Sequence, residues 1–182
     1  NYCDFKNNSE RFELLTQISE TGARYALALP DELTLADDWR GIGFRLAGRT
    51  YVAPMTEVDE VLTMPAYTKV PGVKAWLNGI ANIRGRLLAV IDLGAMLGYQ
   101  PCSKSSKARL LSIKKNDLYS GVIVDEVLGL LTFSSQEKVE PNALDAVDNA
   151  YVKGAFEKDG EHWAVFSFYQ LAESSDFLNV TA

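Results

Sequence analysis

Histidine and cysteine are scarce in this chain of 182 residues, which has one histidine and two cysteines. His162 stands beside Trp163 in a segment with the alternation of a β-strand, where an imidazole is usually structural. The sequence has no GxSxG, P-loop or HExxH motif, and no Cys/His cluster has the spacing of a zinc site. These absences predict a protein without enzymatic activity, cofactor or metal.

Long apolar runs and a basic excess are also missing. No segment approaches the roughly 20 apolar residues of a membrane-spanning helix, and the amino end lacks the pattern of a signal peptide. The formal net charge is −6, whereas proteins that neutralise phosphates carry excess positive charge. Cys3 and Cys102 form no CxxC motif and suit a reducing compartment. The composition favours a cytoplasmic globular protein that neither enters a membrane nor binds nucleic acid.

Residues 1–38 differ from the rest of the chain and predict an N-terminal helical arm with a connector. Ser9 can cap a helix that Gly22 would end, and acidic residues follow in the connector. Phe12, Leu15 and Ile18 recur at helical spacing along this helix. Two interpretations stay open: the arm packs on the surface of the following domain, or it docks onto a partner.

From Trp39 onward the pattern is that of an all-β protein with brief helices. Short alternating segments are separated by Gly, Asn and Asp turns, which favours closed barrels or a sandwich. Val58, Val61 and Leu62 recur at helical spacing, which predicts a short helix over Met55–Leu62. The expected strands are 42–46, 50–53, 77–83, 87–92, 108–113, 118–124, 129–133, 152–157 and 161–166.

The region 79–93 contains two apolar strands around a charged corner, Arg84-Gly85-Arg86. Gly85 can adopt the positive φ that a tight reversal needs. The run from Leu87 to Ile91 has no polar residue, which predicts a strand covered on both faces. Arg84 is then expected at the edge of a buried sheet, where its planar guanidinium suits a carboxylate partner. The corner indicates recognition rather than catalysis.

Three charged segments allow other interpretations. The basic residues between 104 and 115 have no acid among them, and would form an exposed loop or a docking patch for an acidic partner. They also support an alternative function, a β-barrel module that binds a ligand or nucleic acid. Asp125 and Glu126 favour a solvated strand end over a cation site, and Glu137 to Asp148 form an acidic loop. The basic residues are Lys104, Lys107, Arg109, Lys114 and Lys115.

Four short motifs follow one another between Val58 and Val127. They are Val58-Asp59-Glu60-Val61, Gly79-Ile80-Ala81-Asn82-Ile83-Arg84-Gly85, Val90-Ile91-Asp92-Leu93 and Val122-Ile123-Val124-Asp125-Glu126-Val127. Together they resemble the CheW family of chemotaxis adaptors, over the part of the chain from Trp39 to Leu171. The arm and the segment 39–45 are similar to the CheW-like members of type IV pilus chemosensory systems.

The resemblance implies two SH3-like five-stranded β-barrels that share an apolar core, in a domain over 39–175 with a C-terminal tail at 176–182. It implies no enzymatic activity. Such adaptors bind the regulatory domain of a CheA-type histidine kinase and the cytoplasmic hairpin tip of a methyl-accepting chemoreceptor. A cytoplasmic adaptor of this kind is recruited to membrane-associated receptor arrays, here those that control type IV pilus twitching motility.

The resemblance also assigns a site of receptor and kinase interaction around the charged corner. Glu60, on the predicted helix, is expected to pair with Arg84, a contact that adds about 0–1 kcal/mol and holds the site in shape. Val58 would contact a receptor helix, and Asn82 would stabilise the turn. Gly79 would let another backbone approach, or the glycines would serve only the turn and the twist of the strands. The assigned residues are Val58, Glu60, Gly79, Asn82, Arg84 and Gly85.

Overall fold

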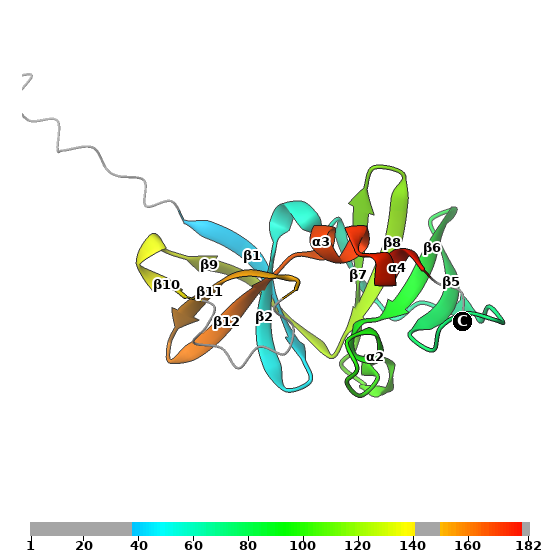
Figure 1. Ribbon diagram of the computed structural model, residues 1–182, viewed down its shortest axis with the longest axis horizontal. Helices are drawn as coiled ribbons and strands as arrows, with labels where there is room; N and C mark the ends of the chain where they lie inside the picture. The colour runs from blue at the N-terminus through cyan, green and yellow to red at the C-terminus, as the bar shows by residue number, and fades with distance from the viewer. Residues whose placement is uncertain (1–37, 141–149, 180–182) are drawn as a thin grey trace, which may run out of the picture. The chain divides into compact units, whose positions relative to one another are not determined.

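The computed structural model describes residues 38–140 and 150–179 (Figure 1). The helix expected between Ser9 and Gly22, and most of the acidic loop after Glu137, lie outside these residues. In the described part, twelve strand segments form two six-stranded sheets, with short helices between them. The mainly β fold is therefore confirmed. No helix in this part is long and apolar enough to cross a membrane.

The first sheet combines strands from the beginning and the end of the domain (Figure 1). Its strand order is β10-β11-β12-β2-β1-β9. All neighbours are antiparallel except β12 and β2, which run parallel. The strands are β1 (Trp39–Leu46), β2 (Arg49–Pro54), β9 (Glu126–Phe133), β10 (Lys138–Val139), β11 (Val152–Lys158) and β12 (Glu161–Phe166).

The second sheet repeats this arrangement with strands from the middle of the chain. Its order is β3-β7-β8-β6-β5-β4, and again one inner pair, β6 with β8, runs parallel. The strands are β3 (Glu60–Thr63), β4 (Tyr67–Thr68), β5 (Leu77–Ile83), β6 (Arg86–Asp92), β7 (Arg109–Lys115) and β8 (Leu118–Val124). The expected hairpin around Arg84 is thus β5 and β6.

Short connections close each sheet into a barrel. β3 and β4 stand at opposite ends of the second sheet, yet only residues 64–66 separate them along the chain. β9 and β10 stand at opposite ends of the first sheet, joined by Ser134 and the 3-10 helix η3 (Ser135–Glu137). Because neighbouring strands lie about 5 Å apart, a flat sheet of six strands is too wide for such connections. Counted as one interrupted strand, each joined pair leaves a five-stranded barrel, as the resemblance implied.

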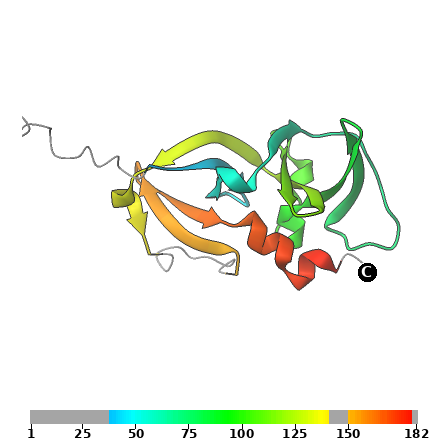
Figure 2. The same ribbon diagram turned by 90° about the horizontal axis from the view of Figure 1, so that it is seen from above.

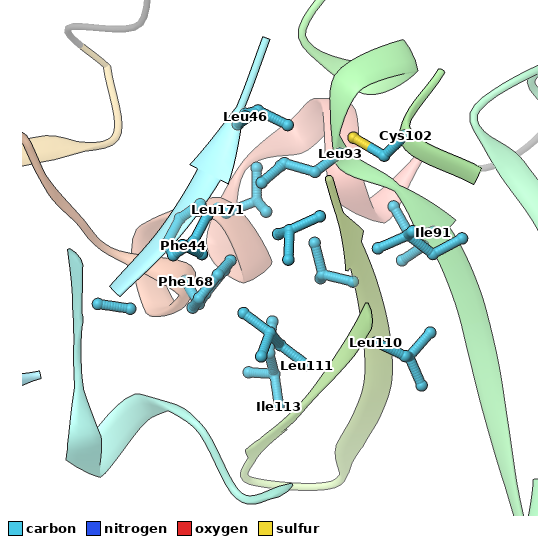
Figure 3. Close-up of a cluster of buried hydrophobic side chains, with 14 of the residues drawn as sticks. Phe44, Leu46, Ile91, Leu93, Cys102, Leu110, Leu111, Ile113, Phe168 and Leu171 are labelled. Carbon is cyan, nitrogen blue, oxygen red and sulfur yellow. The ribbon is translucent and has the colours of Figure 1, made fainter. Parts of the chain in front are cut away.

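One apolar core is shared by the two barrels (Figure 3). Phe44 and Leu46 of β1 lie in the same buried cluster as Leu111 and Ile113 of β7. Phe168 stacks on Phe44 with 5.6 Å between the ring centroids. The first barrel has a second cluster in its own interior, made of Val52, Phe133, Phe156, Trp163 and Val165. Because each buried Phe or Leu side chain contributes about 1.5–3 kcal/mol, the shared cluster holds the barrels together.

The C-terminal helices are packed against this core (Figure 2). α3 (Phe168–Glu173) is capped by Ser167, whose Oγ accepts a hydrogen bond from the Gln170 N–H at 3.3 Å. α4 (Ser175–Leu178) follows, and its Phe177 is 3% exposed and stacks on Trp76. Residues 176–178, expected in a tail, therefore belong to the packed domain because they carry a buried aromatic ring.

The helix expected over Met55–Leu62 is replaced by a turn and a strand. Only the 3-10 helix η1 (Met55–Glu57) forms, and Val58 already has extended backbone with φ −112°. Val61 is exposed, whereas Leu62 packs against the core. The prediction was wrong because β3 pairs with β7 along its whole length, and these backbone hydrogen bonds outweigh a helical spacing of three apolar residues.

The strand expected to be covered on both faces, Leu87 to Ile91, is covered only in part. Leu88, Val90 and Ile91 are buried, but Leu87 is 70% exposed. The reason is that β8 pairs with β6 only from Ala89 onward. The tip of the β5–β6 hairpin therefore extends beyond its neighbour.

Asp92, from one of the family motifs, is fully buried at the end of β6. Its Oδ1 accepts hydrogen bonds from the N–H of Ala95 at 3.1 Å and of Cys102 at 2.9 Å. The first bond caps α2 (Leu93–Met96), and the second holds the 3-10 helix η2 (Cys102–Lys104). Burial, with Asp92 and Asp125 nearby, raises the pKa of the Cys102 thiol, which is free and protonated at neutral pH.

Replacing Phe177 by alanine is expected to destabilise the domain by about 3–5 kcal/mol, because a ring buried against Trp76 is lost. Leu178→Ala is the matched control, since Leu178 is 62% exposed on the same helix. Urea unfolding followed by circular dichroism measures both variants. Equal midpoints for the two would show that α4 contributes nothing to the core.

Gly79→Ala is expected to destabilise the second barrel by about 1–3 kcal/mol through overpacking. A Cβ at Gly79 would overlap the carbonyl oxygen of Thr68 in β4 and lie 2.8 Å from its carbonyl carbon. Gly154→Ala in β11 is the control, because a Cβ there meets nothing within 4 Å. Thermal unfolding of both proteins measures the difference, and an unchanged midpoint for Gly79→Ala would contradict the close packing of β4 on β5.

Candidate functional site

The charged corner is a two-residue turn that joins β5 to β6. Ile83 pairs with Arg86, so only Arg84 and Gly85 lie between the strands. Their φ angles are 52° and 83°, the left-handed conformation at both positions that marks a type I′ turn. The side chain of Asn82 accepts a hydrogen bond from the Gly85 N–H at 2.9 Å. This bond confirms the turn-stabilising role expected for Asn82.

Arg84 forms an ion pair with Glu60, as the sequence predicted. Arg84 Nη2 lies 2.6 Å from Glu60 Oε1. The Arg84 side chain is nevertheless 76% exposed, while that of Glu60 is mostly covered. An exposed pair of this kind contributes about 0–1 kcal/mol to stability, so its main effect is to orient the guanidinium.

The position of this pair follows from the closure of the second barrel. Glu60 begins β3, at one end of the sheet, and Arg84 stands at the tip of the hairpin near the other end. Their contact therefore spans the seam where the sheet closes on itself. The backbone of Glu60 is also held by β7, because its carbonyl oxygen accepts a hydrogen bond from Ser112 Oγ at 3.3 Å.

The remaining two predicted residues have other surroundings. Val58 is half-buried and packs against the shared core, two residues before Glu60. Gly79 is buried, and the backbone that approaches it closely is that of Thr68 in the same chain. The structure thus brings together Glu60, Asn82, Arg84 and Gly85 at the corner, whereas Gly79 packs within the barrel wall.

The strands that carry the corner and Glu60 also bear exposed apolar side chains, which the sequence did not mark. Leu87 pairs with Asn82 and extends beyond β8, and Val61 follows Glu60 on the edge strand. Ile80 is also exposed, on the same hairpin. The sequence predicted that Leu87 was covered, because apolar residues are usually buried. Leu87, opposite Asn82, gives the corner an exposed apolar side chain beside its charge.

Two more exposed apolar side chains, Met55 and Leu130, lie on or next to the first barrel. Leu130 of β9 is opposite Ile42 of β1, which is half-buried. Met55 begins η1, directly after β2. Neither residue belongs to a charged or turn motif, so nothing in the sequence singled them out.

Several residues of the other charged segments have contacts within the described part of the chain. Asp125 Oδ2 accepts a hydrogen bond from the Ala47 N–H at 2.8 Å, and Glu126 forms ion pairs with Arg45 and Lys107 at 3.1 and 3.2 Å. In the basic stretch, Arg109 to Lys115 form β7 rather than a loop. The part of the chain that the structure describes has no group of three His, Cys, Asp or Glu residues placed to hold a metal ion.

Comparison with known proteins agrees with the family resemblance of the motifs over most of the chain. Residues 40–176 match the family described as CheW-like domain. The protein PilI of Pseudomonas aeruginosa is 41% identical over 172 residues, which cover 93% of this chain and 95% of PilI. The chemotaxis protein CheW of Bacillus subtilis is 31% identical over 96 residues, which cover 53% of this chain and 62% of that protein.

A solved structure supports the architecture. The scaffolding protein TtCheW from Thermoanaerobacter tengcongensis superposes with a TM-score of 0.67 and 26% sequence identity. The superposition covers 76% of this chain and 95% of TtCheW. The barrels, the four motifs and the match over residues 40–176 agree, and the chain belongs to the CheW-like domain family.

Proposed function

We propose that this protein is a non-enzymatic adaptor that couples a methyl-accepting chemoreceptor to a CheA-type histidine kinase. Its membership of the CheW-like family, and its similarity to a solved scaffolding protein, support this role. It would act in the cytoplasm, at receptor arrays on the membrane. Its 41% identity to PilI, which covers nearly the whole of both chains, supports a place in the control of type IV pilus twitching motility.

The observation that carries the proposed binding site is the oriented but exposed guanidinium of Arg84. The turn and Glu60 hold it in place, yet most of its side chain is open to a partner. Leu87, opposite Asn82 on the same hairpin, offers an apolar contact beside it. A receptor hairpin tip made of helices can supply both an apolar face and a carboxylate, which is the combination that such a surface recognises.

The kinase regulatory domain is proposed to use a different surface, so that both partners can be held at once. An adaptor-like domain of the kinase would meet strand edges and connecting loops of one barrel. Met55 and Leu130 are exposed apolar residues that could anchor such a contact, because interfaces depend on a few buried apolar side chains.

Arg84→Glu is expected to weaken receptor binding at least about tenfold, or about 1.4 kcal/mol, because it places two carboxylates at the seam. Calorimetric titration would measure binding of the receptor's cytoplasmic hairpin and, separately, of the kinase regulatory domain from the same cell. Circular dichroism confirms that each variant is folded. Lys138→Glu in β10 is the matched control, since it makes the same charge change at an exposed position of the first barrel.

The double variant Glu60→Arg with Arg84→Glu restores an ion pair in the opposite orientation. If the guanidinium itself contacts the receptor, the double variant recovers the stability of the seam but not the affinity. Unchanged affinity of folded Arg84→Glu for both partners would remove the corner from the proposed site. A wild-type protein that binds neither partner would contradict the adaptor role itself.

A further inference from the structure

Glu57 is a buried carboxylate outside the proposed binding site. It is 5% exposed, and Asp92 is the other buried acidic residue in the part of the chain described. The Asp92 side chain serves as the N-cap of α2. A carboxylate loses much of its hydration on burial, and it is tolerated only where hydrogen bonds or an opposite charge replace the lost water.

Four contacts replace the hydration that the Glu57 carboxylate loses on burial. Ser167 Oγ lies 3.0 Å from Oε1 and 3.1 Å from Oε2, and the Tyr169 N–H donates to Oε2 at 3.1 Å. Lys153 Nζ lies 3.4 Å from Oε1 and supplies the opposite charge. In addition, the Tyr169 hydroxyl donates to the carbonyl oxygen of Thr56 at 2.8 Å, next to Glu57 in the chain.

These contacts join three separate parts of the chain at one carboxylate. Glu57 belongs to η1, the only link along the chain between β2 of the first barrel and β3 of the second. Lys153 belongs to β11 of the first barrel, and Ser167 and Tyr169 form the start of α3. The next residues after Glu57 are Val58 and Asp59, and then Glu60, the partner of Arg84.

We propose that Glu57 is a positioning residue that fixes the segment carrying Val58 and Glu60 relative to α3. The inference rests on the proposed function, because it concerns the shape of the same binding surface. Loss of the carboxylate releases η1 from α3. Glu60 then loses its fixed position at the seam, and the Arg84 guanidinium loses its orientation.

α3 has a second anchor, and this anchor supplies a control. Lys115 of β7 forms an ion pair with Glu173, and its Nζ lies 4.9 Å from the centre of the Tyr169 ring. Lys115 contacts Tyr169 and Glu173 of α3, whereas Glu57 belongs to η1 itself. A change at Lys115 therefore loosens the helix without releasing the segment that leads to Glu60.

The test compares Glu57→Gln with Lys115→Met. Glutamine keeps the shape of the side chain, but its amide replaces one accepting oxygen by a donor and removes the negative charge. Amide hydrogen exchange is followed at Tyr169, which donates to Glu57, and at Asp59, which donates to the Ser112 carbonyl at 2.8 Å. We expect Glu57→Gln to speed exchange at least tenfold at both amides, and to weaken receptor binding at least fivefold.

Lys115→Met is expected to leave the Asp59 amide and the affinity unchanged. Equal effects of the two variants on affinity would overturn the inference, since they would show only a general loosening of α3. So would an unchanged Asp59 amide in folded Glu57→Gln. Exchange is measured without a partner, so a wild-type protein that fails to bind the receptor would contradict the proposed function while the exchange data still decide the role of Glu57.

Lys153→Met keeps the test decisive if Glu57→Gln does not fold. Lys153 is half-exposed, so the substitution removes the opposite charge without emptying the core. We expect faster exchange at the Tyr169 and Asp59 amides in this variant as well, by at least threefold. No change at either amide would overturn the inference.

Discussion

Closure of each sheet by a very short connection is the constraint on which the rest of the structure depends. Residues 64–66 must join the first and last strands of the second sheet, so that sheet curves until its ends meet. The curvature brings the tip of the β5–β6 hairpin to β3, and this is why Arg84 can reach Glu60 at 2.6 Å. It also presses β4 onto β5 at Gly79, where no side chain fits. The candidate site is a consequence of closing the barrel.

Several charged side chains among the described residues hold neighbouring segments in place. Glu126 binds Arg45 and Lys107, Asp125 caps a turn, and Glu57 joins η1 to the start of α3. Each of these acids has its partner within the chain. Glu60 orients Arg84 and leaves it 76% exposed, and Lys107 is similarly exposed beside Glu126, at 69%. What sets Arg84 apart is its place in a two-residue turn at the tip of a hairpin.

Local patterns predicted the hairpin around Arg84 well because a type I′ turn and two alternating strands depend on neighbours in sequence. The ion pair with Glu60 was also anticipated, although Glu60 was expected on a helix. The errors arose where distant strands decide the outcome. β7 draws Glu60–Thr63 into an edge strand, and the limited reach of β8 leaves Leu87 exposed. The sequence did not predict the hydrogen bonds to the Glu57 carboxylate, because their donors lie 96 to 112 positions away along the chain.

The sequence by itself determined the mainly β class, the turns and the corner that presents Arg84, since these depend on residue preferences and on contacts a few positions apart. Only the tertiary structure decided that Phe177 packs on the core, that Gly79 faces Thr68, and which apolar side chains remain exposed. Burial is set by what the closed barrels and the helices bring from elsewhere in the chain, and no local pattern contains that information.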